Sequence, residues 1–313
     1  MPVSPRLALM LSVPPLLWAG NAVVGRLAIG SITPLWLNAG RWALALLLLL
    51  PLGWRAFGSA PRRAQIVERW PQLALLSLTG VGAYNALQYL ALKTSTPLNV
   101  TLIAASSPVW MLAIGALCYG EHPRRSQLIG AGLSLAGVAV VLSRGEAAAL
   151  LRVQLVPGDL LMLLAVFCWC VYSWLLARPP ASMRPGQRPD WDWAEFLCIQ
   201  IVLGLGWATA AAGVGEWLQP TTRPIAWTPW LVAAVLYVAI GPSLIAYRLW
   251  GLGVAQAGPA LAAFFANLTP LFAALLSAAL LGEWPQLFHA LAFALIVAGI
   301  IVSSRPAHRP RRS

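Results

Sequence analysis

Long apolar runs separated by short polar segments set the pattern of this chain. Ten runs are each close to the roughly 20 residues that a helix needs to cross the hydrocarbon core of a bilayer. They cover about residues 7–27, 34–53, 71–92, 98–119, 125–143, 158–177, 194–213, 229–250, 259–281 and 286–303. The polar residues that remain are too few to form the water-facing surface of a soluble protein. The pattern therefore predicts an all-α polytopic membrane protein with ten transmembrane helices.

An internal repeat organises these runs. Residues 105–123 read ASSPVWMLAIGALCYGEHP, and residues 267–285 read NLTPLFAALLSAALLGEWP. Four residues of the first segment recur 162 positions later, as the pairs Pro108 and Pro270, Gly120 and Gly282, Glu121 and Glu283, and Pro123 and Pro285. The starts of the halves also correspond, since Trp18 aligns with Trp169 at an offset of 151. We predict a first repeat at 1–143, an external loop at 144–157, a second repeat at 158–304 and a basic cytoplasmic tail at 305–313.

Each predicted repeat holds five helices, and this odd number decides the topology. The second repeat must enter the membrane upside down relative to the first, so Glu121 faces the cytoplasm and Glu283 the outside. Inverted repeats are typical of secondary transporters, in which the solute binds between the halves and their rocking gives alternating access. A duplication kept only for helix packing is the alternative.

Composition supports the membrane assignment and changes the meaning of the charge. The 313 residues are 59% hydrophobic and 10% charged, with a mean hydropathy of +0.75 and a net charge of +12. With a cytoplasmic N-terminus, 14 basic residues fall in internal segments, and the external loops hold only 5, namely Arg26, Lys93, Arg144, Arg152 and Arg223. This bias places both termini in the cytoplasm. The charge then predicts contact with anionic lipid and no nucleic-acid partner.

The cysteines and the N-terminus indicate features that we do not expect in this protein. No disulfide framework and no metal site are expected, because all the cysteines lie within apolar runs or at their ends: Cys118, Cys168, Cys170 and Cys198. No cofactor is expected either. The first run lacks a small-residue cleavage site in a polar context, so we expect it to remain as a helix rather than be removed as a signal peptide.

The repeated segment predicts a bend and a helix end. Proline within an apolar run removes a backbone hydrogen bond and bends the helix, and Gly120 stands where a helix C-terminus favours a left-handed residue. The candidate hinge or gating residues are Pro108, Glu121, Gly241, Pro242, Pro270 and Glu283, the Gly-Pro pair being an interruption of the eighth run. The alternative for each glutamate is a simple water-facing helix end.

Neutral polar and aromatic side chains inside the runs are the candidate binding residues. In the third run, for example, tyrosine, asparagine and glutamine recur at helical spacings, and such side chains within hydrocarbon face the bundle interior. The full candidate set is Trp18, Asn21, Tyr84, Asn85, Gln88, Tyr89, Trp110, Trp169, Tyr172, Tyr247, Phe264 and Asn267. The alternative for each tryptophan is a place in the aromatic belt at headgroup depth.

Arg41 is a candidate intramembrane cation in the second run. Either it extends toward the external interface, or it stays buried and pairs with helix carbonyls or with a solute carboxylate. No Asp or Glu lies at the middle of any run, so a proton relay through a buried carboxylate has no obvious residue to carry it.

Several stretches together resemble the EamA family of the drug/metabolite transporter superfamily. They are LLWAGNAVVGR in the first run, an early arginine in the second, YNALQYLALKTSTPLNVTLI in the third and fourth, and the twice-repeated Pro-to-Gly-Glu helix. The resemblance implies ten helices in two inverted repeats, a bacterial inner-membrane location, and export of small metabolites or xenobiotics through a cavity lined by helices 1, 3, 4, 6, 8 and 9. The many tryptophans point, within the family, to exporters of aromatic amino acids. Tyr172 stands where the first repeat has Asn21, so a role of that asparagine would not be duplicated.

We predict a secondary transporter, not an enzyme, that exports a small amino-acid-like or aromatic solute as a monomer or weak homo-oligomer. A facilitator or exchanger that uses no ion gradient stays open, because the runs lack a midplane carboxylate. A membrane-embedded transferase acting on lipids is the alternative from another class. It would need an acidic cluster near a leaflet surface, and the nearest approach is Asp190, Asp192 and Glu195.

Overall fold

The computed structural model describes residues 4–28, 31–95, 97–152, 154–184, 186–218, 220, 225, 227–281 and 286–304. Every regular element within these ranges is helical, which confirms the all-α class. Glu283, one of the candidate gating residues, lies outside the described residues, as does the predicted tail at 305–313.

All ten apolar runs are helical. In the first half they form α1 (Pro5–Leu27), α2 (Pro34–Gly53), α4 (Trp70–Ser77) with α5 (Tyr84–Ala91), α6 (Pro97–Ala105) with α7 (Ser107–Tyr119), and α8 (Arg125–Leu142). In the second half they form α10 (Pro157–Ala177), α11 (Trp193–Leu218), α12 (Pro229–Val238) with α13 (Ala246–Ala257), α14 (Pro259–Ala266) with α15 (Thr269–Leu281), and α16 (Leu287–Ser303). The short helices α3 (Ala60–Glu68) and α9 (Ala147–Leu151) lie in connections.

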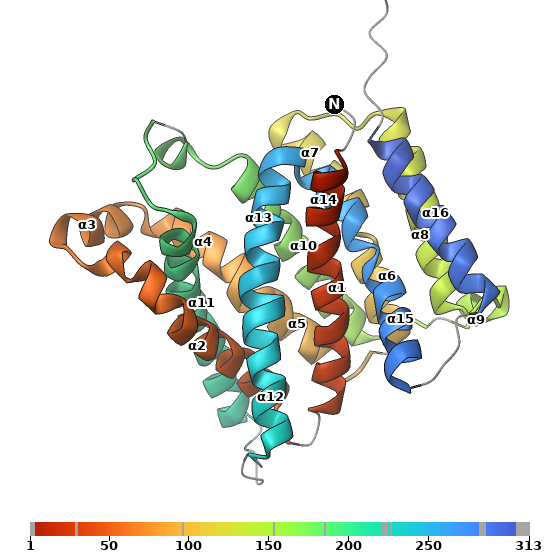
Figure 1. Cartoon of the computed structure of the whole chain (residues 1–313), viewed down its shortest axis with the longest axis horizontal. Helices are drawn as coiled ribbons and strands as arrows, with labels where there is room; N and C mark the ends of the chain where they lie inside the picture. Colours follow the sequence, from red (N-terminus) through yellow and green to blue (C-terminus); the bar gives the residue numbers. More distant parts are fainter. Residues whose placement is uncertain are drawn as a thin grey trace, which may run out of the picture.

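Most of these runs, but not all, are long and apolar enough to cross a bilayer. Within the described residues, six helices are long and apolar enough to cross a bilayer, or seven when the bent pair α6 and α7 counts as one. Outside this set are α1, which is a continuous helix of 23 residues, the interrupted third run, and α16 with 17 residues. The protein is a polytopic membrane protein in which several crossings are built from broken helices. Figure 1 shows α1 starting and α16 ending at the same end of the bundle, as an even number of crossings requires.

Corresponding helices of the two halves pack against each other. α8 lies along α16 at one edge of the molecule, and α2 packs on α11 toward the opposite edge (Figure 1). The α8–α16 contact is close, because a Cβ added to Gly130 would come within 2.7 Å of the Gly299 carbonyl oxygen, and a Cβ on Gly299 within 2.7 Å of the Gly130 oxygen. Glycine at both positions lets the two backbones approach.

The third and eighth runs are interrupted at matching places. A π-helical segment, Leu78–Ala83, joins α4 to α5, and another, Ala239–Ile245, joins α12 to α13. Leu78 and Ile240 differ by the repeat offset of 162. The first segment packs on α11 and the second on α2. The sequence indicated only the second interruption, through Gly241 and Pro242, which are buried there.

The fourth and ninth runs are also broken at matching places. α6 ends at Ala105 and α7 begins at Ser107 after a bend of 40°. α14 ends at Ala266 and α15 begins at Thr269, but this stretch still counts as one span. Pro108 and Pro270 sit in the first turn of the second piece, where the missing N–H removes no helical hydrogen bond. The chain therefore bends at Ser106, two residues before Pro108, rather than at the proline itself. Gly120 ends α7 with a φ of +67°, which confirms the predicted left-handed residue.

Candidate solute-binding cavity

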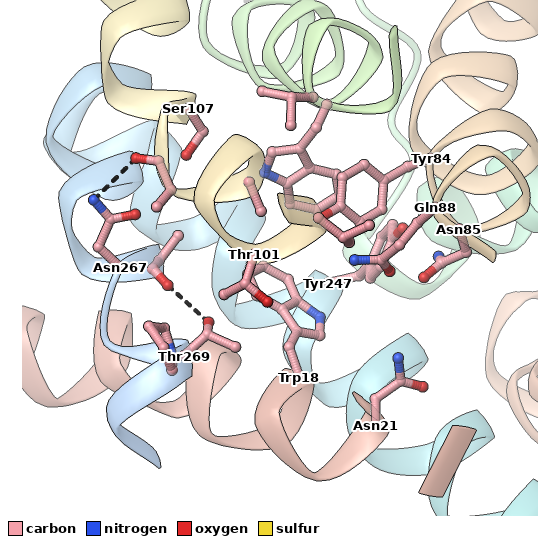
Figure 2. A pocket seen from close by; sticks show the side chains of 17 residues that line it. Trp18, Asn21, Tyr84, Asn85, Gln88, Thr101, Ser107, Tyr247, Asn267 and Thr269 are labelled. Atoms are coloured by element: carbon pink, nitrogen blue, oxygen red, sulfur yellow. Dashed lines mark hydrogen bonds between the residues drawn. The ribbon is translucent and has the colours of Figure 1, made fainter. Parts of the chain in front are cut away.

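A cavity of about 140 Å³ lies between the two halves. Figure 2 shows that its walls come from several helices, with Trp18 and Asn21 projecting from α1 and the amide of Gln88 facing them. The lining residues are Trp18, Asn21, Tyr84, Asn85, Gln88, Val100, Thr101, Ala104, Ala105, Ser107, Val166, Trp169, Tyr247, Ala266, Asn267, Thr269 and Pro270. They belong to runs 1, 3, 4, 6, 8 and 9, the set that the family resemblance implied.

Most of the candidate binding residues meet in this cavity. Eight of the twelve line it, from α1, α5, α10, α13 and the α14–α15 junction: Trp18, Asn21, Tyr84, Asn85, Gln88, Trp169, Tyr247 and Asn267. One candidate hinge residue, Pro270, also lines it. Their roles in solute binding stay predictions.

Four candidate binding residues lie outside the lining. Trp110 is 36% exposed on the outer surface of α7, while the next residue, Met111, points into the core. Phe264 is fully buried among core side chains. Tyr172 donates its hydroxyl to Gln200 Oε1 (3.2 Å), and the Tyr89 hydroxyl is buried without a hydrogen-bond partner among the described residues. The run that holds Trp110 is apolar on every side, so spacing alone did not fix which of its faces turns to the cavity.

Aromatic rings form one wall. The Trp169 ring lies 5.2 Å from Trp18 in an edge-on contact and 5.3 Å from Tyr84. Trp250 packs behind Trp169 at 5.2 Å and donates Nε1–H to Ser173 Oγ at 3.1 Å. Because these rings hold each other in place, the wall presents a preformed apolar surface to a solute ring.

Amides and hydroxyls form the other wall, where the two broken helices meet. Asn267 Nδ2 donates to the Ala105 carbonyl (3.2 Å) and to Ser134 Oγ (2.8 Å), and Figure 2 shows the first of these bonds. Asn267 and Ala105 are themselves related by the 162 offset. The amide thus satisfies a carbonyl freed at the matching break in the other half.

Arg41 lies beside the cavity and is buried, with 1% of its surface exposed. Its Nε–H donates to Ser243 Oγ at 2.9 Å, and its Nη1 donates to Asn21 Oδ1 at 3.3 Å. The guanidinium also lies 5.2 Å from the centre of the Trp42 ring. Of the alternatives for this residue, the structure excludes extension to the external interface.

The candidate gating residue Glu121 lies at a surface contact. Its carboxylate accepts hydrogen bonds from Arg178 Nη2 and from Arg178 Nε, the latter at 3.1 Å. A stack of Tyr119 on Trp174, with ring centres 4.6 Å apart, lies between the same helices. These contacts join the C-terminal ends of α7 and α10.

Two of the acidic residues near residue 192, Asp192 and Glu195, form hydrogen bonds and an ion pair that support the start of α11. Asp192 Oδ1 accepts the backbone N–H groups of Ala194 and Glu195 at the start of α11, and Glu195 forms an ion pair with Arg62 at 2.5 Å. Among the described residues, no group of three or more His, Cys, Asp or Glu side chains is placed to hold a metal.

Sequence comparison with known proteins decides the family. Residues 6–143 and 156–305 match the model of the EamA-like transporter family. The chain belongs to the EamA family. It is therefore a transporter rather than an enzyme.

Relatives agree with this assignment. The chain is 29% identical over 303 residues to an uncharacterized transporter of Archaeoglobus fulgidus, covering 96% of this chain and 98% of the relative. It is 28% identical over 244 residues to the aromatic amino acid exporter YddG of Ancylobacter novellus, covering 77% and 78% of the two chains. A solved structure titled only as the crystal structure of a protein matches the fold with a TM-score of 0.72 at 24% identity, over 95% of this chain and 96% of that one.

Small residues of the lining were missed by reasoning from sequence. They come mainly from the two broken helices and include Val100, Thr101, Ala104, Ser107, Val166, Ala266 and Thr269. The repeat held a signal, because Ala104 pairs with Ala266 and Ser107 with Thr269 at the 162 offset. Small side chains at duplicated positions next to a helix break indicate room for a solute.

Proposed function

We propose that this protein exports small solutes that carry an aromatic or other hydrophobic group, most simply amino acids of that kind, by alternating access in a bacterial inner membrane. The observation that carries the proposal is the cavity between the halves, with rings on one wall and amides on the other. The rings offer apolar surface to the hydrophobic part of a solute. Neutral amides and hydroxyls can orient its polar part without attracting a fully hydrated ion.

Alternating access is supported by the placement of the helix breaks. The fourth and ninth runs break beside the cavity, and both halves contribute to the lining. Discontinuous helices at the interface of two inverted repeats are the arrangement in which rocking of one half exposes a site to either side in turn. On this proposal the two halves have opposite orientations, both termini are cytoplasmic, and Pro108 and Pro270 lie at the hinges.

A facilitator that uses no ion gradient is the second candidate. In the part of the chain that the structure describes, no carboxylate lines the cavity, so a proton-coupling residue is not among its walls. Efflux of labelled solute from vesicles with and without an imposed proton gradient separates coupled export from facilitated diffusion.

The proposal is tested with L-phenylalanine in proteoliposomes that contain the purified protein. Trp18→Ala removes an indole from the cavity wall, and Trp110→Ala removes one from the outer surface, so the two variants differ mainly in place. We expect Trp18→Ala and Gln88→Ala to reduce phenylalanine flux at least tenfold and Trp110→Ala to leave it within about twofold. Equal flux in all three variants, with folded yield unchanged, would remove this cavity from the transport path.

A further inference from the structure

Arg41 is a buried cation whose contacts are with neutral groups. The hydroxyl of Ser243, the amide oxygen of Asn21 and the ring of Trp42 surround its guanidinium. The ion pairs found among the described residues are Arg62 with Glu195, Arg69 with Glu68, and Arg178 with Glu121, and none includes Arg41. A charge held in a low-dielectric interior is costly unless it is paired with an opposite charge.

The chain places its own carboxylates far along the helices from this position. Acidic residues occur at helix ends or in connections, as at Asp159 in the first turn of α10 and Glu216 in the last turn of α11. Arg41 stands in the eighth position of α2. Among the described residues no carboxylate forms an ion pair with Arg41, so an anionic solute is a candidate for its counter-charge.

The same face of α2 carries further polar groups that lack protein partners. Asn38, Arg41 and Trp42 are three and four residues apart and share one side of the helix. Asn38 is 1% exposed and Trp42 is fully buried. Neither atom of the Asn38 amide nor the Trp42 Nε1–H has a hydrogen-bond partner among the described residues. Buried polar atoms without a partner call for an explanation. Here they are two donors, Asn38 Nδ2 and Trp42 Nε1, and one acceptor, Asn38 Oδ1.

Asn21 connects this face to the cavity. Its Oδ1 accepts from Arg41, so its Nδ2 is the end that remains to donate toward the cavity that it lines. Ser243 cannot donate a hydrogen bond to a solute in this way, because its hydroxyl already donates to the Val238 carbonyl at 2.7 Å while accepting from Arg41. Trp42 reaches the cavity wall from the other side, with its ring 5.0 Å from that of Tyr247.

We infer that the solute carries a carboxylate, that this carboxylate binds at the Asn21 end of the cavity by accepting from the amide Nδ2, and that Arg41 behind Asn21 is its counter-charge. The inference rests on the proposed export function and narrows the substrate class to anionic or zwitterionic solutes. Hydrogen bonds between charged groups are stronger than those between neutral groups, and the buried setting strengthens the attraction further. The orientation of the solute follows, with its carboxylate toward α1 and α2 and its ring toward Trp169.

The test compares a carboxylate with its amide. Proteoliposomes are loaded with labelled L-phenylalanine or L-phenylalaninamide, and L-leucine with L-leucinamide provides a second pair without an aromatic ring. The variants are Arg41→Gln, which removes the charge, Arg41→Lys, which keeps it, and Gln200→Leu as a control at the eighth position of α11, the place that Arg41 has in α2. We expect at least tenfold faster flux of each carboxylate over its amide in the unaltered protein and in Gln200→Leu, and loss of this preference in Arg41→Gln. If Arg41→Gln does not fold, Asn21→Ala with Arg41 intact is expected to weaken the same preference.

Each outcome decides between the two proposals. Equal flux of carboxylate and amide in the unaltered protein overturns the carboxylate inference and leaves export of hydrophobic solutes standing. A preference that survives unchanged in both Arg41→Gln and Asn21→Ala also overturns the inference, because the recognition then lies elsewhere. Absence of flux for both members of both pairs overturns the proposed function together with the inference.

Discussion

The corner between α1 and α2 and the corresponding corner between α10 and α11 differ in charge. In the first half, Asn21 of α1 bonds to Arg41, the eighth residue of α2. In the second half, Tyr172 of α10 bonds to Gln200, the eighth residue of α11. Tyr172 is the residue that the repeat aligns with Asn21. The two halves thus keep the same connection between their first two helices, with a charged pair in one and a neutral pair in the other.

The two halves share some structural features and differ in others. Features that hold the bundle together recur in both halves, as in the π-helical segments and the breaks of the fourth and ninth runs. The buried charge occurs in the first half alone among the described residues at these two corners. A solute with unlike ends requires such a difference, because two identical walls would bind it in two opposite orientations.

The largest effect is expected when the second corner is given the charge of the first. Gln200→Arg places a guanidinium at a position that is 2% exposed, where the neighbouring polar groups are the Tyr172 hydroxyl and the Phe196 carbonyl, both neutral. An uncompensated buried charge of this kind costs about 3–5 kcal/mol. We expect a clear fall in the folded yield and in the Tm of the protein in detergent, whereas Gln200→Leu changes the Tm far less. A Gln200→Arg protein with an unchanged Tm would show that both corners accept charge.

The next largest effect on stability is expected at the contact between α8 and α16, to which each half contributes one glycine. Gly130→Ala and Gly299→Ala each push a methyl group against a backbone oxygen of the partner helix. Overpacking of this kind costs about 1–3 kcal/mol, and we expect the two substitutions to lower the Tm by similar amounts. Gly132→Ala on the same helix meets open space and serves as the control. Equal Tm values for all three variants would contradict the close approach of α8 and α16.

A smaller effect is expected from the neutral corner. Tyr172→Phe removes the hydroxyl that donates to Gln200 and leaves a buried amide oxygen unpaired. The loss of such a bond costs about 1–3 kcal/mol; the bond that Gln200 Nε2 donates to the Phe196 carbonyl is kept, so the side chain stays in place. The preference for phenylalanine over its amide should stay intact. A change in that preference would assign solute recognition to the second corner as well.

The smallest effect on stability is expected at the exposed ion pair. Glu121→Gln weakens the contact with Arg178, and exposed pairs contribute about 0–1 kcal/mol. We therefore expect the Tm to stay within about 2 °C of the unaltered value. Transport kinetics decide the role of this residue, since a gate predicts a changed flux and a simple helix end predicts none.

The fold was predictable because hydropathy and the repeat constrain it directly. Each run had the length of a membrane helix, and Gly120 had the residue type that a left-handed helix end requires. The π-helical segment at Leu78–Ala83 carries Gly80 and Gly82 but no proline, so its residues marked the break less clearly than Pro242 marks its counterpart. Packing against α11 is the tertiary contact that accompanies it.

The cavity was predictable only where polar residues mark a face. Asn85 and Gln88 were correctly placed because a membrane helix turns such side chains inward. The rotation of α7 was not predictable, since its apolar residues give no preferred side and Trp110 could equally have faced the cavity. The burial of Arg41 depends on Ser243 and Asn21, which are distant in sequence, so the choice between its alternatives required the structure.

Labelling of a single cysteine tests most directly whether the central cavity opens to each side of the membrane in turn, as alternating access requires. The native cysteines Cys118, Cys168, Cys170 and Cys198 are first replaced by alanine. Ala104→Cys then places a thiol in the cavity lining, and Val67→Cys on the exposed connecting helix α3 is the control. An impermeant thiol reagent should reach the cavity cysteine from either side of the membrane, and phenylalanine should slow that labelling at least severalfold without affecting the control. Labelling of Ala104→Cys from one side only, at a rate that phenylalanine does not change, would contradict alternating access through this cavity.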